Sequence, residues 1–249
     1  MNKKSNHPLI LAPAGNRASF MAAVAAGADA IYCGLKQHSA RMEAKNFSIE
    51  ELSILAPFAH EKGILLYIAM NSLIRPDDLL AAGRAIDLLN RHVHPDALII
   101  QDISLISMAR KAGFQKEIHL STLANAGFPE ALKMIGKIEG VDCVVIPREL
   151  DIDEIKQMAA ACPDRLSLEI FIHGALCYGV SGRCYWSSFF GGKSGLRGRC
   201  VQPCRRFYSQ GEKREKFFSC LDLGLDVLVR TVEKTNKIRA WKIEGRKKG

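Results

Sequence analysis

The sequence contains no long hydrophobic run. No stretch of about 18 consecutive apolar residues occurs in the chain, which argues against a helix that spans a membrane. The apolar run near the N-terminus, residues 9–12, is also too short for the core of a secretory signal peptide. We therefore expect a cytoplasmic protein with no membrane partner, in which cysteine thiols stay reduced.

Several catalytic and cofactor-binding motifs are missing as well. There is no H-E-x-x-H sequence, the motif of one large class of zinc proteases. Ser181 and Ser187 do not lie in a G-x-S-x-G context, so a serine nucleophile of that type is not indicated. No G-x-G-x-x-G follows the first expected strand, which disfavours a Rossmann-like sheet, the main alternative fold.

What the sequence does contain is a group of four cysteines in a stretch rich in glycine and arginine. They follow the spacing C-x6-C-x15-C-x3-C and are Cys177, Cys184, Cys200 and Cys204. In a reducing compartment, such a group indicates metal ligation rather than disulfide bonds. Three other cysteines stand singly among apolar residues, as small buried side chains do: Cys33, Cys143 and Cys162.

The spacing of the four cysteines favours an iron–sulfur cluster over zinc. Four-cysteine zinc sites usually carry two close pairs of the form C-x2–4-C, and only Cys200 and Cys204 have that spacing. Iron–sulfur ligation accepts irregular spacing, so we predict a [4Fe-4S] cluster, with zinc or no metal as the alternatives. Cys204 is the nearest candidate for the fourth ligand, and Cys220 is the alternative.

The net charge of +9 is concentrated in two segments. Residues 193–216 hold eight Lys and Arg against two Glu, and residues 237–249 hold six against one. Such localised charge favours an anionic partner, namely nucleic acid, phosphate or a small carboxylate, and a solvated loop with a basic tail is the plainer alternative. Arginine suits both phosphate and dicarboxylate, and the candidates here are Arg183, Arg197, Arg199, Arg205 and Arg206.

Short apolar runs rich in β-branched residues alternate with helical patterns along the chain. Ser48 and Glu51 form a capping box for the helix after the second strand. The alternation predicts a parallel sheet covered by helices, and eight units in about 250 residues favour a closed TIM-like (β/α)8 barrel. The expected strands are residues 9–14, 30–35, 64–68, 97–101, 117–121, 143–146, 166–172 and 238–243.

The expected barrel is one α/β domain over residues 1–249, with a cysteine-rich insertion after the seventh strand. We call residues 169–220 the cysteine segment. A short strand over 217–221 and a helix over 225–235 are expected before the last strand. Only six residues follow that strand, too few for the helix that would cover it. We therefore expect a truncated chain whose natural protein continues C-terminally.

In such a barrel, catalytic groups gather at the C-terminal ends of the strands. Glu169 and His173 lie two strand periods apart on the seventh strand, so they are expected on one face. Their joint placement with other polar residues at one barrel mouth indicates a functional site. The polar residues at or after the other strand ends are Asn16, Asn71, Gln101, Asp102, His119, Ser121, Asn125, Arg148 and Glu149.

The segment EIFIHGALCYGVSGRC, residues 169–184, resembles the signature of peptidase family U32. That signature has an acidic residue, an aromatic residue, a His-Gly-Ala turn and two cysteines separated by six residues. One departure is Leu123, where members often carry Gln after a Ser-Thr pair, and this position bears on the choice of substrate. The resemblance also includes Asn71 and the motifs LAPAG (11–15), YCG (32–34), ARMEAKNF (40–47), HLST (119–122), REL (148–150) and KIEGR (242–246).

The resemblance implies a TIM-like N-terminal domain and one of several activities. Members include collagenase-like proteases of unknown catalytic type and proteins of prephenate-dependent RNA hydroxylation, on tRNA wobble uridine or a ribosomal cytidine. Others form oxygen-independent ubiquinone hydroxylation complexes with iron–sulfur clusters held by four cysteines. With the basic segments, this predicts an iron–sulfur protein that supports hydroxylation of a nucleobase in tRNA or rRNA. The alternatives are a U32 peptidase and a partner subunit of a paralogous protein in quinone hydroxylation.

The peptidase alternative needs a thiolate paired with a histidine within hydrogen-bond reach. Cys177 follows His173 by four residues, but three further cysteines nearby make ligation the simpler explanation. The predicted catalytic residues are Glu169, His173 and His119. The predicted residues for binding substrate or prephenate are Arg41, Asn71, Arg148, Arg183, Arg197, Arg199, Arg205 and Arg206.

Overall fold

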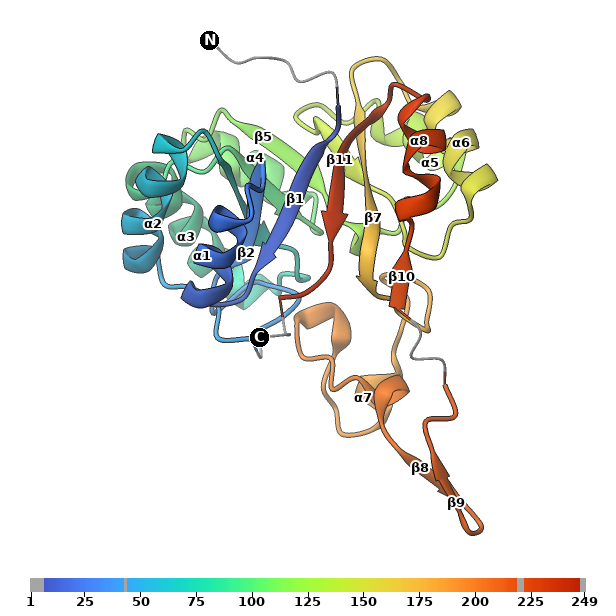
Figure 1. The fold of residues 1–249 in the computed structure, drawn as a ribbon. Helices are drawn as coiled ribbons and strands as arrows, with labels where there is room; N and C mark the ends of the chain where they lie inside the picture. The colour runs from blue at the N-terminus through green and yellow to red at the C-terminus, as the bar shows by residue number, and fades with distance from the viewer. Residues whose placement is uncertain (1–6, 43, 219–221, 247–249) are drawn as a thin grey trace.

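Eight parallel strands close into a barrel (Figure 1). The structure is a computed structural model that describes residues 7–42, 44–218 and 222–246. β11 pairs with β7 on one side and β1 on the other, and β6 also pairs with β7, so these eight strands form a closed ring. The predicted TIM-like barrel is therefore confirmed. Its strands are β1 (Leu9–Ala14), β2 (Ala30–Gly34), β3 (Leu65–Met70), β4 (Ala97–Ile100), β5 (Glu117–Leu120), β6 (Cys143–Val145), β7 (Ser167–Ala175) and β11 (Ile238–Ile243).

Helices cover the outside of the barrel. Apolar side chains such as Phe20, Leu52 and Ile86 fill the layer between helices and strands, whereas a smaller apolar group that includes Leu11 and Tyr67 fills the barrel interior. No helix in the described part of the chain is long and apolar enough to cross a membrane. The helices are α1 (Arg17–Ala25), α2 (Ile49–Glu61), α3 (Leu79–His92), α4 (Ser104–Lys111), α5 (Pro129–Ile135), α6 (Ile152–Ala161) and α8 (Val229–Glu233).

The expected elements agree closely with the structure up to the seventh strand. The first and last barrel strands match residue for residue, and the others differ at their ends by at most three residues. The capping box at α2 is confirmed. The amide of Glu51 donates to Ser48 Oγ at 3.2 Å, and the amide of Ser48 donates to the Glu51 carboxylate at 2.8 Å. Local signals of this kind act within a few residues, so sequence reveals them directly.

The strand predicted over 217–221 and the helix predicted over 225–235 differ from the structure in their position and length. Residues 217 and 218 are not in a strand, and 219–221 lie outside the described residues. The strand there is β10 (Asp222–Gly224), which pairs antiparallel with the far end of β7. The helix predicted over 225–235 is a 3-10 turn, Asp226–Leu228, followed by the short α8. The antiparallel pairing on β7 thus uses residues 222–224, which lie between the predicted strand and the predicted helix.

The part of the cysteine segment that follows β7, residues 176–218, lies outside the barrel (Figure 1, orange). It contains α7 (Trp186–Phe189) and a small antiparallel hairpin of β8 (Tyr208–Gln210) and β9 (Lys213–Glu215). The hairpin extends away from the barrel, whereas the loops before it lie against the mouth. Residues 244–246 follow β11 and lie over the same mouth. The expectation that the natural protein continues beyond them stays a prediction.

Candidate functional site

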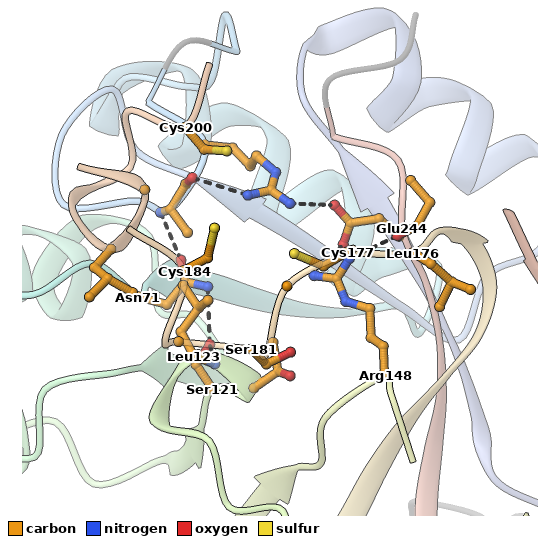
Figure 2. Close-up of a pocket in the computed structure, with 18 of the residues that line it drawn as sticks. Asn71, Ser121, Leu123, Arg148, Leu176, Cys177, Ser181, Cys184, Cys200 and Glu244 are labelled. Carbon is orange, nitrogen blue, oxygen red and sulfur yellow. Dashed lines mark hydrogen bonds and ion pairs between the residues drawn. The ribbon is translucent and has the colours of Figure 1, made fainter. Parts of the chain in front are cut away.

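The four cysteines of the cysteine segment line one cavity at the C-terminal mouth of the barrel, which we call the mouth cavity. Cys177 is exposed and the other three are half-buried. Figure 2 shows the sulfur atoms of Cys177, Cys184 and Cys200 directed into a shared space. None of the seven cysteines in the described residues forms a disulfide. Cys220 lies outside those residues, so its role as an alternative ligand stays a prediction.

A close contact with the barrel fixes the loop that carries Cys184. Gly182 has φ +70°, and a Cβ atom there would come within 2.1 Å of the Leu123 carbonyl oxygen, so only glycine allows this approach. The neighbouring Ser181 donates its amide and hydroxyl to the two carboxylate oxygens of Glu149, at 2.7 and 2.9 Å. The glycines of the cysteine segment thus let its loops press onto the strand ends.

Three arginines and one glutamate form the charged side of the mouth cavity. Arg41 contacts Glu244 at 3.2 Å and Arg148 contacts it at 3.6 Å, while Arg246 is buried and donates to Ser39 Oγ at 2.9 Å. Burial alone would raise the pKa of Glu244, but the surrounding arginines lower it to about 2. Three guanidinium groups against one carboxylate leave excess positive charge, so the site favours an anion.

Two aromatic rings form the floor below these charges. The ammonium of Lys242 lies 4.6 Å from the centre of the Tyr32 ring, and the Arg148 guanidinium lies 4.4 Å from that of Phe171. The Tyr32 hydroxyl donates to the Ile243 carbonyl oxygen at 2.8 Å, and burial raises its pKa. A ligand in the cavity therefore meets flat apolar faces below and cationic donors at the side.

The glycines of two N-terminal motifs make room for Arg246. A Cβ on Gly15 would lie 1.8 Å from the Arg246 carbonyl oxygen, and a Cβ on Gly34 would lie 2.7 Å from its guanidinium. The motifs LAPAG, YCG and KIEGR therefore converge at one point of the mouth. Sequence reasoning had not assigned a role to Lys242, Glu244 or Arg246. Their position at the end of the last barrel strand was the signal that could have found them.

Asn71 and Leu123 are among the residues that line the mouth cavity. The Asn71 side chain accepts from the amide of Ala40 at 3.0 Å and donates to Ser121 Oγ at 3.2 Å, so it holds the loop of Arg41 against the mouth. Asn71 therefore positions the wall of the cavity. Leu123 contributes an apolar side chain at the point where the family resemblance led us to expect Gln.

The structure does not bring His173 to the mouth cavity. Its side chain is exposed and is not among the residues that line the cavity. The register between β7 and β11 shifts by one residue between Phe171 and His173, so the strict alternation that placed Glu169 and His173 on one face is lost. The expectation of a shared face was therefore wrong for this pair.

The five arginines of the cysteine segment also separate. Arg205 lines the cavity, where it donates to the Leu176 carbonyl and contacts Asp222. Arg197 lies 3.9 Å from Asp78 on the barrel. The other three are exposed and do not line the cavity, namely Arg183, Arg199 and Arg206.

His119 and Glu169 do come together, in the barrel core beneath the cavity. His119 Nδ1 and Glu169 Oε1 lie 2.6 Å apart, and both side chains are fully buried. Among the described residues, the one group of His, Cys, Asp or Glu side chains whose candidate ligand atoms all lie within 4.8 Å is His119, Cys143 and Glu169. Such a group could hold a metal ion, although Lys242, 2.9 Å from Glu169, already supplies a cation there.

The fold and the mouth define a TIM-like barrel protein with a cysteine-lined and arginine-lined cavity. The sequence profile of peptidase family U32 matches residues 15–249, so the chain belongs to that family. The solved structure of a U32 peptidase, Mk0906, superposes with a TM-score of 0.64 over 98% of this chain and 96% of its own. At 14% identity, this likeness shows the fold alone.

Curated relatives carry names of two kinds. The collagenase of Porphyromonas gingivalis is 33% identical over 96% of this chain and 61% of its own length. The 23S rRNA 5-hydroxycytidine synthase of Escherichia coli is 37% identical over 82% of this chain and 30% of its own length. The tRNA hydroxylation protein P of Haemophilus influenzae is 37% identical over 82% of this chain and 44% of its own length. The chain thus spans less than two thirds of each of these relatives.

Proposed function

We propose that this chain is the barrel domain of an enzyme that hydroxylates a nucleobase in tRNA or rRNA, with an iron–sulfur cluster and a prephenate-like dicarboxylate at the mouth. The observation that carries the proposal is the convergence of four cysteines and four arginines on one cavity. The names of the two RNA-modifying relatives support the substrate class. A cytoplasmic location, where thiols stay reduced, would suit both the cluster and the RNA.

The cysteine set fits an iron–sulfur cluster better than zinc. In a tetrahedral zinc site, Zn–S bonds of about 2.3 Å would hold the sulfurs about 3.8 Å apart. No three of the four described mouth sulfurs meet within 4.8 Å. A four-iron cluster is larger than one ion and holds its thiolates farther apart. We therefore assign Cys177, Cys184, Cys200 and Cys204 as its ligands.

The chain's own residues would bind and orient the second ligand. A bound cluster would supply electron-transfer or Lewis-acid chemistry beside the cavity. Arg148 and Arg246 would hold the carboxylates of a dicarboxylate, because a dianion matches the excess of positive charge around Glu244. Tyr32 and Phe171 would support an apolar ring, and Phe171 also fixes the plane of the Arg148 guanidinium.

The outer part of the cysteine segment would contact RNA. Its positive charge is accompanied by exposed aromatic side chains, among them Tyr185, Phe189 and Phe207. Arg214 and Lys216 lie 5.9 and 5.4 Å from the Phe207 ring centre. Phosphate contacts from cations and stacking of bases on aromatic rings are the two usual sources of affinity for single-stranded RNA.

Iron and sulfide analysis of anaerobically purified protein tests the cluster. We expect brown protein with about four iron and about four sulfide per chain, as four-thiolate ligation of a cubic cluster requires. Cys177→Ala and Cys184→Ala should lose the iron, whereas Cys33→Ala and Cys162→Ala should keep it because those thiols are buried and do not line the mouth cavity. Colourless protein with one zinc per chain would overturn this assignment.

Peptidase activity is the second candidate, supported by the similarity to the collagenase. A cysteine nucleophile needs a base within hydrogen-bond reach. No histidine is among the described residues that line the mouth cavity, so the geometry favours ligation over nucleophilic attack. Peptide hydrolysis by apo-protein that Cys177→Ala abolishes would favour the peptidase. A paralogous chain that co-purifies with the protein would instead favour the third candidate, a subunit of a quinone-hydroxylation complex.

A further inference from the structure

A chain of polar side chains crosses the barrel core from one end to the other. Lys242 Nζ lies 2.9 Å from Glu169 Oε2, and Glu169 Oε1 lies 2.6 Å from His119 Nδ1. The other ring nitrogen of His119 lies 3.0 Å from Glu117 Oε2, and Glu117 Oε1 accepts from Arg239 at 2.7 Å. Each contact is short enough for a hydrogen bond, so the five side chains form one continuous network.

The two ends of this network open to different places. Lys242 lines the mouth cavity. Glu117 is the first residue of β5 and Arg239 is near the start of β11, so they lie at the opposite end of the barrel, which we call the base. Both line a second cavity there, and their side chains are 36% and 30% exposed. The middle members, His119 and Glu169, are fully buried.

Stability alone does not account for such a network. Taking charges out of water costs several kcal/mol per ion, and replacing buried ion pairs by apolar side chains is often neutral or stabilising. The rest of the barrel interior follows that rule, with side chains such as Leu11, Ala69 and Ile99. This network joins a ligand cavity to solvent. Buried groups with shifted pKa values in such a position are typical of functional sites.

The carboxylates next to His119 stabilise the protonated form of its ring. Burial by itself would lower the pKa of His119, but the carboxylates of Glu169 and Glu117 raise it above its ordinary value. Burial likewise opposes ionisation of Glu169, yet Lys242 and His119 hold its pKa at about 2. The titratable or charged groups that surround the ring are Glu117 on β5, Tyr67 on β3, Cys143 on β6, Glu169 on β7, and Lys242 and Arg239 on β11.

We propose that Lys242 is the residue that exchanges a proton with the ligand of the mouth cavity, and that Glu169, His119 and Glu117 couple Lys242 to solvent at the barrel base. When Lys242 gives its proton to the ligand, the amine is left beside Glu169. The proton on His119 Nδ1 then moves to Glu169, which passes one proton to Lys242. His119 is then neutral, with its one proton on Nε2. Solvent protonates Glu117 at the base, and once the ring proton has moved from Nε2 to Nδ1, Glu117 gives its proton to Nε2 and the starting state returns. One proton leaves at the mouth and one enters at the base, so charge is conserved.

The coupling can be measured without turnover. NMR of the full chain, with 15N-labelled histidine and lysine, follows the His119 ring nitrogens and Lys242 Nζ against pH. We expect the two His119 nitrogens to change in one pH step. The Lys242 Nζ signal should report that step through its contact with Glu169, the partner of His119. Glu117→Gln should lower the midpoint of that step by about 1 pH unit, the usual effect of losing an adjacent opposite charge. Arg239→Gln should raise it, because Glu117 then acts on His119 without compensation.

A matched surface variant and the enzyme assay complete the test. Asp164→Asn removes the carboxylate 2.9 Å from Lys237 on the exterior and should move neither signal. A change at His119 that leaves the Lys242 signal unmoved in both base variants would overturn the coupling. In the RNA-hydroxylation assay, Lys242→Met should lower kcat more than it raises KM, and Glu117→Gln should shift the pH profile of kcat. Unchanged values in an active enzyme would refute the catalytic role, whereas inactive wild-type protein would count against the proposed function alone.

Discussion

Arg148 is the side chain best prepared to receive an anion in the mouth cavity. It is buried against Phe171, donates to the Ala175 carbonyl at 2.9 Å, and contacts Glu244 at 3.6 Å. Its Nε has no hydrogen-bond partner among the described residues. An unsatisfied buried donor of this kind costs free energy until a ligand accepts from it. The dicarboxylate part of the proposed function therefore depends on this residue.

Thermal unfolding with and without succinate, a simple dicarboxylate probe, tests that role. We expect succinate to raise Tm, since a ligand that binds only the folded state stabilises it. Arg148→Met should reduce the affinity at least about tenfold, because a charge-assisted hydrogen bond contributes about 1.5–3 kcal/mol. Arg183→Met removes the same charge from an exposed residue outside the cavity and should leave the Tm shift intact. Equal loss in both variants would indicate a general charge effect and no site at Arg148.

The cysteine segment divides its basic residues between two tasks. Arg197 and Arg205 contact the acidic groups of Asp78 and Asp222, so part of their charge is compensated within the molecule. Arg199 and Arg206 are exposed, and their side chains form no ion pair among the described residues. Electrostatic attraction of RNA to the cysteine segment should therefore depend more on Arg199 and Arg206 than on Arg197 and Arg205.

Salt titration of RNA binding measures this contribution. Binding of a single-stranded RNA should weaken with salt at a log–log slope of about −0.7 per phosphate contact. Arg199→Ala together with Arg206→Ala should flatten that slope by about 1.4 if each makes one contact. Arg84→Ala together with Arg91→Ala, which removes the same charge from exposed positions on α3, should leave the slope unchanged. A flattening of equal size in both pairs would rule out a specific role for the segment.

At the scale of the whole molecule, acid should destabilise the fold through two buried carboxylates. The folded pKa of Glu169 and of Glu244 is about 2, against an ordinary value of 4.5. At both sites burial alone would raise the pKa, but the neighbouring cationic side chains lower it by more. A depressed carboxyl pKa contributes stability that is present above the ordinary value and is lost as pH falls toward the folded value. The sensitive window is therefore between pH 4.5 and about 2.

Urea unfolding as a function of pH tests this expectation. The free energy of unfolding should fall through that window, and Glu244→Gln should make the fall less steep because one of the two linked protonations is gone. Glu139→Gln, at an exposed surface position, should leave the slope as it is in the wild type. A Glu244→Gln profile parallel to the wild type would mean that Glu244 does not contribute to the acid sensitivity.

The barrel itself was predictable because its signals are local or repetitive. A strand that is buried on both faces consists of consecutive apolar residues, as in residues 97–100. Eight such runs with helices between them are compatible with only a few folds. The C-terminal strand ends then mark the mouth. The cysteines that gather there, from Cys177 to Cys204, were recognisable by type and spacing alone.

Only the tertiary structure decided how charged groups from distant strands meet. Arg246 fits beside Gly34, and Lys242 reaches Glu169 across 73 residues, because β11 closes the barrel between β7 and β1. The register shift that sends His173 outward likewise arises from pairing with β11. Composition and periodicity show which residues a strand contains. Pairing, register and bulges determine which of those residues face one another, and these depend on contacts far apart in the chain.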